Sequence, residues 1–306
     1  MRSAANSIPD KPLSKKQFES LHQWLEQKAG QYNHPSFIGE DPISVPHRFS
    51  QLQDIEIAGF FAAIMAWGQR KTIINKANEL MVLMDDAPFD FVRHHTEKDR
   101  KRFLSFKHRT LQPDDILFLV EVLQQYYLKH VSLEDAFARH LTNADEDVYN
   151  GLAGFYEMVF DQPWILERTR KHIATPVRKS SCKRLNMFLR WMVRSDDQGV
   201  DFGLWKNIAS SQLIIPLDLH VGNVARRLQL LSRPVNDWQA AKELTTMLKR
   251  FDTDDPVKYD FALFGSGINP CHQWILCHRP DRLHPRGRER YKILLSTLHP
   301  QRLSKW

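Results

Sequence analysis

The sequence predicts an all-α protein, and three features of the chain support this fold class. Apolar residues recur at spacings of three and four along most of the chain, which is the periodicity of helices with one buried face. No stretch alternates apolar and polar residues in the way that predicts a strand. The sequence also lacks internal repeats and the glycine patterns of Walker and Rossmann nucleotide sites. We therefore expect helices packed on helices.

The N-terminal half is expected to form helices separated by turns. Residues 1–14 are polar and are expected to be loosely ordered. A first helix is predicted over residues 15–29, and residues 31–50, which contain three prolines, are expected to form an extended connection. Residues 86–112 are mixed and basic, so we expect their charges to face solvent or phosphate. Further helices are predicted over residues 54–70, 72–84, 113–127, 132–140 and 148–167.

Two amphipathic helices in the second half carry the candidate site. Ser180 or Ser181 is the expected N-cap of the first, which places Lys183 in its first turn. The helix dipole opposes a cation there, and a lysine acts as a nucleophile through its uncharged amine. The apolar stripe of this helix comprises Leu185, Phe188, Leu189 and Met192. Its opposite face carries Lys183, Met187, Arg190 and Arg194.

The second of these helices is expected to begin at Asp218, two residues after Pro216. Asp218 is its predicted N-cap, where the helix dipole favours a negative charge. The apolar stripe comprises Leu217, Val221, Ala225 and Leu228. An aspartate in this position is most often a cap only, and a lysine beside arginines is most often part of a solvated face. The pattern by itself leaves a structural role open for both residues.

The last part of the chain adds two helices and a basic tail. One helix is predicted over residues 237–250, and a final core helix over residues 257–268 is expected to be closed by Gly265 and Gly267. Residues 279–306 contain eight basic and two acidic residues. Such a tail is solvated surface in most proteins, and beside a DNA cleft it would add phosphate contacts.

Composition and charge restrict the class of partner. The chain has 306 residues, a formal net charge of +7 and a pI near 9.3, which favours an anionic partner. It is long enough to bury one large core or two lobes. The first residues lack the apolar region of a signal peptide, and the longest apolar run, residues 57–68, is too short to cross a bilayer. We expect a soluble, cytoplasmic protein without a membrane partner.

The cysteines exclude a disulfide-rich scaffold. The chain has only Cys182, Cys271 and Cys277, which is typical of a protein from a reducing compartment. Cys271 and Cys277 are too few for a four-cysteine iron–sulfur cluster, and no cofactor is expected. Together with His272 and His278 they leave a metal site open.

One segment resembles a known sequence motif. LDLHVGNVARRL, residues 217–228, is similar to the VDTHVxRVxxRL segment of the helix-hairpin-helix DNA glycosylase superfamily, and residues 183–192 resemble the second hairpin helix of its bifunctional members. The resemblance implies that Lys183 attacks the sugar, that Asp218 supports the developing positive charge, and that His220 is the histidine of the motif. Asp218 follows Lys183 by 35 positions, a spacing similar to that of the archaeal 8-oxoguanine glycosylase (AGOG) branch. The chain also resembles an uncharacterised bacterial family that has this same sequence pattern.

Two positions depart from the superfamily pattern. PVRKSSCK, residues 176–183, stands where a Gly-x-Gly hairpin turn is expected, and Leu219 stands in place of the threonine of the motif. Ser180, Ser181 and the free N–H groups of a helix start are the remaining candidates for phosphate contacts in this hairpin.

A second segment, AWGQR at residues 66–70, is similar to the LSxQ corner of the superfamily. The likeness implies that Gln69 enters the gap left by an extruded base, and a polar loop position is the alternative. Phe188, Trp191 and Trp274 are candidates to stack on that base, and a core position is the alternative for each. The residues expected to contact substrate or DNA are Trp67, Gln69, Ser181, Met187, Phe188, Arg190, His220 and Trp274.

The resemblance also implies an architecture and an activity. Residues 51–217 would form a central lobe that includes the hairpin, and residues 1–50 and 218–306 a second lobe, with a DNA cleft between them. The implied activity is a base-excision repair glycosylase with AP lyase activity that removes an oxidised base, 8-oxoguanine first, through a lysine Schiff base. The expected partner is double-stranded DNA with a damaged base or abasic site, bound by a monomer.

Two other functions remain compatible with the sequence. The first is a non-catalytic DNA-binding protein of the same fold, which the missing hairpin glycines favour. The second is a basic helical protein that binds RNA or acidic proteins through residues 279–306.

Overall fold

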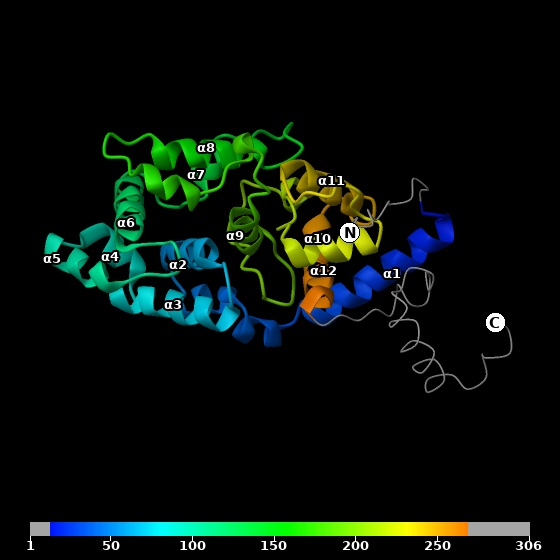
Figure 1. The fold of residues 1–306 in the computed structure, drawn as a ribbon, viewed down its shortest axis with the longest axis horizontal. Helices are drawn as coiled ribbons and strands as arrows, with labels where there is room; N and C mark the ends of the chain where they lie inside the picture. The colour runs from blue at the N-terminus through cyan, green and yellow to red at the C-terminus, as the bar shows by residue number, and fades with distance from the viewer. Residues whose placement is uncertain (1–12, 269–306) are drawn as a thin grey trace, which may run out of the picture.

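The computed structural model describes residues 13–268, and this part of the chain is helical (Figure 1). No strand occurs in these residues, only two isolated bridges, His108 with Leu111 and Ser180 with Asp237. The predicted all-α class is confirmed for the part of the chain that is described. None of the helices in residues 13–268 has the length and apolar character needed to cross a membrane.

Twelve α-helices follow one another in the described residues. They are α1 (Lys15–Tyr32), α2 (Leu52–Met65), α3 (Arg70–Leu83), α4 (Pro88–His94), α5 (Glu97–Arg100), α6 (Pro113–Tyr127), α7 (Asp135–Ala138), α8 (Tyr149–Phe160), α9 (Lys183–Val193), α10 (Leu219–Arg227), α11 (Trp238–Lys249) and α12 (Tyr259–Ile268). Short 3-10 helices connect several of them, among them η1 (Pro35–Glu40), η2 (Pro42–Ser44), η3 (Pro46–Arg48), η5 (Glu167–Lys171) and η6 (Pro176–Arg178).

Several boundaries differ from the sequence prediction for local reasons. Residues 31–50 are not extended, because α1 continues to Tyr32 and proline then starts each of η1, η2 and η3. Proline suits the first position of a helical turn, where no N–H bond is lost. The helix predicted over residues 72–84 begins earlier, because α3 starts at Arg70 with Gln69 as its N-cap. The helix predicted over residues 148–167 ends at Phe160.

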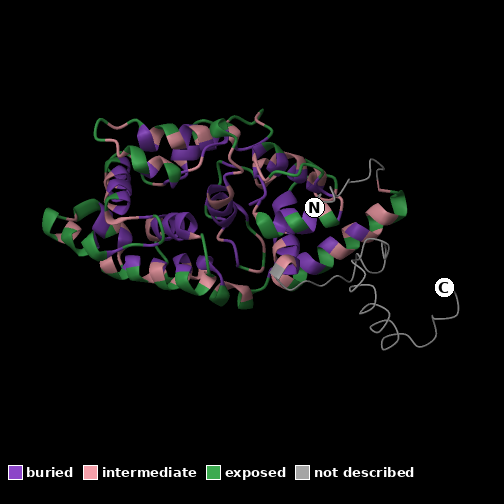
Figure 2. Cartoon of the chain, viewed as in Figure 1, coloured by how far each residue is buried: buried purple, intermediate pink, exposed green. Residues whose placement is uncertain are grey.

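The centre of the fold is α2, which is apolar around its whole circumference. Every residue from Ile55 to Met65 is buried, as expected of a helix surrounded by other elements. The helices α3, α4 and α9 pack on it, and α2 and α9 appear largely buried in Figure 2. η2 and η3 contact α2 as well, so residues 42–48, which the resemblance places in the second lobe, pack against the central helices.

A single buried carboxylate joins α2 to three other segments. Glu56 has no exposed surface. It accepts hydrogen bonds from the Tyr127 hydroxyl (2.8 Å), the Ser132 hydroxyl (2.5 Å), the Leu133 N–H (3.0 Å) and the Trp205 indole N–H (2.7 Å). Burial raises the pKa of Glu56, and these four hydrogen bonds oppose the shift. The carboxylate therefore satisfies four buried donors at once.

Replacing Glu56 by alanine is expected to destabilise the protein strongly. The change leaves four buried donors without their acceptor, and we expect a loss of about 3–5 kcal/mol in the free energy of unfolding, because each orphaned group costs about 1–3 kcal/mol and neighbours relax in part. Urea unfolding of the full-length protein measures it. Glu97→Ala, at an exposed position of α5, is the matched control. A Glu56→Ala protein within about 0.5 kcal/mol of wild type would contradict this role.

The first and last described helices lie side by side (Figure 1), and α10 packs on α12. Gly265 permits the contact between α1 and α12, because a Cβ atom there would lie 2.4 Å from the Tyr32 ring. A Cβ atom at Gly267 would meet the Cβ of His220 on α10 at 3.1 Å. The expectation that these two glycines end the helix was wrong, because α12 runs through both to Ile268 and uses them for close packing.

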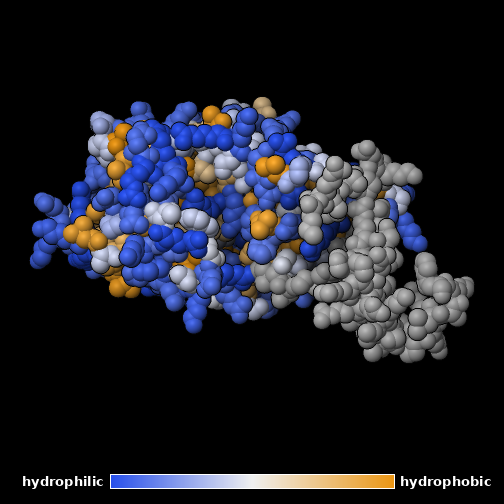
Figure 3. Space-filling view, in the orientation of Figure 1, coloured by the Kyte–Doolittle hydropathy of each residue, from blue (hydrophilic) through white to orange (hydrophobic). Residues whose placement is uncertain are grey.

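One face of the molecule is largely hydrophilic. Figure 3 shows apolar residues there in small separate groups among polar and charged ones. Scattered apolar residues are normal on a protein surface. Interactions on this face therefore depend mainly on polar and charged side chains.

Candidate functional site

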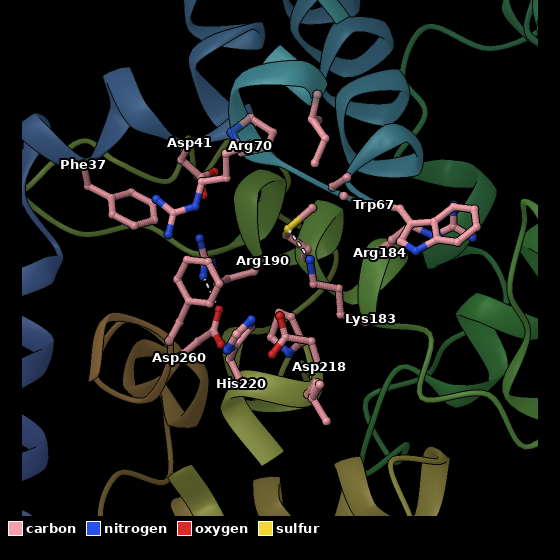
Figure 4. A pocket seen from close by; sticks show the side chains of 18 of the residues that line it. Phe37, Asp41, Trp67, Arg70, Lys183, Arg184, Arg190, Asp218, His220 and Asp260 are labelled. Carbon is pink, nitrogen blue, oxygen red and sulfur yellow. Dashed lines mark hydrogen bonds and ion pairs between the residues drawn. The ribbon is translucent and has the colours of Figure 1, made fainter. Parts of the chain in front are cut away.

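A cavity of about 580 Å³ lies between α3, α9, α10 and α12, with the turn after α2 and the segment η1–η2 on its walls (Figure 4). Cavities that hold small ligands occupy about 300–1,000 Å³. Phe37 and Asp41 lie on one side of it in Figure 4, and Trp67 and Arg184 on the other. Segments from the whole described chain thus meet at this one place.

The start of α9 is built by an unusual turn. The predicted caps were wrong, because Cys182 is the N-cap, with a left-handed φ of 50°. The Ser180 hydroxyl instead accepts a hydrogen bond from the Cys182 N–H (3.1 Å), and the Ser181 hydroxyl donates to the Leu217 carbonyl (3.3 Å). Lys179 is also left-handed, with φ 61°. Two non-glycine residues thus adopt backbone conformations that glycine would adopt without strain.

Lys183 is the first residue of α9, and its side chain lines the cavity. The amine Nζ lies 3.6 Å from the sulfur of Met187, which also lines the cavity. Within residues 13–268 the amine forms no ion pair with a carboxylate. A lysine with an apolar neighbour and no carboxylate partner is suited to react with a bound molecule.

Asp218 is the N-cap of α10, as predicted, and faces the same cavity. Its Oδ1 accepts a hydrogen bond from the Val221 N–H (2.9 Å), and its carbonyl accepts one from Asn236 (2.8 Å). The hydrogen bond from Ser181 to Leu217 joins the segment before Lys183 to the segment before Asp218. Two residues that lie far apart in the sequence are therefore held around one space (Figure 4).

Two further carboxylates that line the cavity were not predicted from the sequence. Asp41 accepts a hydrogen bond from the Ile43 N–H (3.1 Å), and burial raises its pKa. Burial also raises the pKa of Asp260 to about 6, a shift that Arg190 and Lys183 oppose and Asp218 increases. Oδ1 of Asp260 is buried without a hydrogen-bond partner. A signal for Asp260 was present in the sequence, because a charged residue inside an apolar helix needs a buried partner.

Arg190 and Arg194 are buried, although the sequence grouped them with a solvated face. Arg190 pairs with Asp260 and, at 3.3 Å, with Asp201. Arg194 pairs with Asp201 (3.1 Å), and also with Asp255 (2.8 Å) and Asp196 (2.6 Å). Arg190 lines the cavity, but its charge is already matched by aspartates. Its guanidinium is therefore engaged in buried ion pairs with Asp201 and Asp260.

Of the aromatic residues predicted for the site, Trp67 lines the cavity, whereas Phe188 and Trp191 do not. Phe188 is fully buried, with its ring centroid 5.3 Å from that of Trp205, and it does not line the cavity. Trp191 is fully buried as well. Phe188 and Trp191 belong to the core, because α9 is buried on other faces as well as on its apolar stripe. Trp274 lies outside the described residues. The aromatic side chains that do line the cavity are Phe37, Trp67 and Phe264.

Of the remaining predicted residues, His220 lines the cavity, and Gln69 and Ser181 do not. His220 is exposed on the first turn of α10 and lines the cavity. Gln69 is exposed at the start of α3, between Gly68 and Arg70, which both line the cavity, but is not itself part of the lining. Ser181 is used in the hydrogen bond to Leu217.

Three other cations line the cavity without a carboxylate partner among the described residues. They are Arg70, Lys171 and Arg184. Arg184 donates a hydrogen bond to the Ile64 carbonyl (2.6 Å) at the C-terminal end of α2, a favourable place for a cation. Burial lowers the pKa of Arg184. With Lys183, these side chains make the cavity suitable for a ligand with negative charge.

The described part of the chain contains no candidate metal site. No group of three or more His, Cys, Asp or Glu side chains in residues 13–268 is arranged to hold a metal ion. Burial raises the pKa of Cys182 to about 12, which keeps its thiol protonated. Cys271, His272, Cys277 and His278 lie outside the described residues.

Comparison with known proteins gives one match. No curated protein and no solved structure matches the chain. A family model described as "Protein of unknown function (DUF2400)" matches residues 41–269. This range is about three quarters of the 306 residues and includes Asp41, Lys183, Asp218 and Asp260. The chain is a member of the DUF2400 family.

Proposed function

We propose that this protein is a DNA base-excision repair glycosylase with AP lyase activity, with an oxidised base, 8-oxoguanine first, as substrate. One observation carries the proposal: Lys183 and Asp218, each at the start of its own helix, line one cavity. The resemblance of residues 217–228 and 183–192 to segments of the helix-hairpin-helix glycosylases implies the roles of these two residues. A two-lobed glycosylase-like fold with a DNA cleft is part of the proposal.

In this mechanism the lysine is the nucleophile. The Lys183 amine attacks C1′ of a nucleotide turned out of the duplex, and the bond from C1′ to the base breaks, so that the base leaves with the electron pair and takes up a proton. The amine loses a proton, and opening of the sugar ring gives a Schiff base. Loss of a proton from C2′ then expels the 3′ phosphate, which nicks the strand.

Asp218 supplies charge stabilisation. Its carboxylate is oriented by the Val221 N–H (2.9 Å), and Oδ2 forms no hydrogen bond within residues 13–268. A fixed carboxylate lowers the energy of an oxocarbenium-like transition state, in which positive charge develops on the sugar. The cavity volume, the aromatic walls and the unpaired cations agree with a flipped nucleotide and its phosphate.

The alternative is a protein that binds DNA without catalysis. The absence of glycine from residues 176–183 favours it, because hairpin glycines usually let phosphate approach the backbone. The left-handed conformations of Lys179 and Cys182 weigh against it, since they give the turn a glycine-like backbone.

A trapping assay tests the proposal. Full-length protein is incubated with a panel of duplexes that carry 8-oxoguanine, other oxidised bases or an abasic site, with borohydride present, and an undamaged duplex is the control. We expect a covalent complex and a nicked strand with at least one lesion duplex. Binding to every duplex without trapping or base release would support the non-catalytic alternative, and no binding to any duplex would refute both.

A further inference from the structure

An arginine outside the predicted site lies against the tryptophan at the mouth of the cavity. The guanidinium carbon of Arg109 is 4.3 Å from the centroid of the Trp67 ring. Trp67 lines the cavity and is 49% exposed, and Arg109 is exposed as well. A guanidinium stacked on an aromatic face is held in place while its N–H edge stays available.

The backbone holds this arginine in position by three features. The N–H and carbonyl groups of His108 and Leu111 pair at 3.0 and 2.9 Å and close a tight turn, in which Arg109 is left-handed with φ 55°. The His108 ring donates a hydrogen bond to the carbonyl of Met65, the last residue of α2 (3.0 Å). Gly68 has φ 120°, and a Cβ atom there would lie 2.6 Å from Nη1 of Arg109. Strained conformations of this kind persist where the surroundings fix them, and they gather at functional sites.

The guanidinium of Arg109 has no competing partner. Across residues 13–268 it forms no side-chain hydrogen bond and no ion pair with a carboxylate, and it lies over the Trp67 ring. Five N–H donors are therefore free, and their planar arrangement matches two oxygens of a phosphate. Lys171, Lys183 and Arg184 line the adjacent cavity, also without carboxylate partners in that range.

We propose that Arg109, held on Trp67, binds a phosphate of the DNA strand next to the nucleotide that enters the cavity. The assignment rests on the proposed function and adds a positioning residue to it. It supplies a contact to the strand that does not depend on the hairpin, where no glycine occurs in residues 176–183. Arg109 acts through the placement of the strand and takes no part in the chemistry at Lys183.

Salt-dependent binding tests this assignment. The affinity of the full-length protein is measured for a duplex with a tetrahydrofuran abasic analogue over a range of NaCl concentrations. Arg109→Ala is expected to raise Kd about 10-fold near 0.1 M salt and to reduce the slope of log K against log salt by about 0.9, the value for one lost phosphate contact. Arg109→Lys keeps the charge and is expected to keep the slope while losing the planar contact.

Two variants control for charge and for folding. Arg93→Ala removes an exposed arginine that lies over Phe89 (5.8 Å) on α4, outside the cavity lining, and wild-type binding is expected. Arg109→Gly relieves the strain of a left-handed residue, so its thermal midpoint is expected at or above that of wild type while its affinity falls as for Arg109→Ala.

The outcomes separate the two proposals. Trapping of Arg109→Ala on saturating abasic duplex at the wild-type rate is expected, since only binding changes. If the wild-type protein binds the duplex and is trapped, an unchanged Kd and an unchanged salt slope for Arg109→Ala would overturn this assignment alone. A wild-type protein without affinity for the duplex overturns both. A further outcome is that inorganic phosphate, added at fixed ionic strength, abolishes the difference in Kd between wild type and Arg109→Ala. In that case Arg109 binds free phosphate, and the assignment to the strand fails.

Discussion

Replacing Lys183 by glutamine is expected to abolish covalent trapping and strand nicking. Glutamine has a similar length, but its amide nitrogen is not a nucleophile and cannot form a Schiff base. We expect the rate of nicking to fall by at least about 1,000-fold, because covalent catalysis is removed altogether. The affinity for the abasic-analogue duplex should stay within about 5-fold of wild type, since one phosphate-facing charge at most is lost. Borohydride trapping and gel analysis measure the first effect.

Two other lysine variants serve as controls for this test. Lys98→Gln removes an exposed lysine of α5, outside the cavity lining, and normal trapping is expected. Lys171→Gln removes another lysine that lines the cavity, so weaker DNA binding with retained trapping at saturating DNA is expected. Covalent trapping of Lys183→Gln at the wild-type level would show that a different amine reacts, and the mechanism proposed for Lys183 would be wrong.

Replacing Asp218 by asparagine is expected to slow base release by about 100–1,000-fold, the usual effect of losing one charge-stabilising group at a transition state. Asparagine caps a helix about as well as aspartate, so the start of α10 and the fold should be retained. Single-turnover release of the damaged base measures the effect, and thermal unfolding checks the fold. Trapping on a preformed abasic site should be less affected, because no bond to a base is broken.

The chain provides a matched control for this change. Asp237 is the N-cap of α11 and accepts a hydrogen bond from the Ala240 N–H (3.0 Å), much as Asp218 does from Val221. Asp237 does not line the cavity. Asp237→Asn should therefore release base at the wild-type rate. Equal loss of activity in both asparagine variants would mean that the effect at Asp218 does not come from its charge in the cavity.

The sequence predicted the parts of the site that depend on local patterns. The cap role of Asp218 was predicted from Pro216 and the apolar stripe that follows, and both lie within a few residues of it. The first turn of α9 was placed at Lys183 for similar reasons, but its cap was missed. The left-handed Cys182 forms a local hydrogen bond with Ser180, and the adjacent Ser181 bonds to a distant carbonyl. No short window of the sequence contains this second bond.

The parts that were missed depend on contacts between distant segments. Asp260 and Arg190 are 70 positions apart and form a buried ion pair. The apolar sequence around Asp260 indicates that it needs a buried partner but does not identify that partner. Phe188 was a candidate for the site because its ring could stack on a base, but the ring packs against Trp205, and its helix packs on α2. Arg109 gave no local signal, since its position follows from the His108 contact with the end of α2.

The packing of α1 on α12 has a consequence for the order of assembly during translation. The ribosome releases α1 first, while its partner surface around Gly265 is made only near the end of the described chain. Leu21 and Leu25 of α1 are fully buried in the finished protein. Until α12 is made, α1 lacks one of the helices that pack on it, and its exposed apolar surface is a site where chaperones can bind the nascent chain. A chain cut short before α12 would contain Lys183 and Asp218 but not Asp260, so an unfinished product would lack one wall of the cavity.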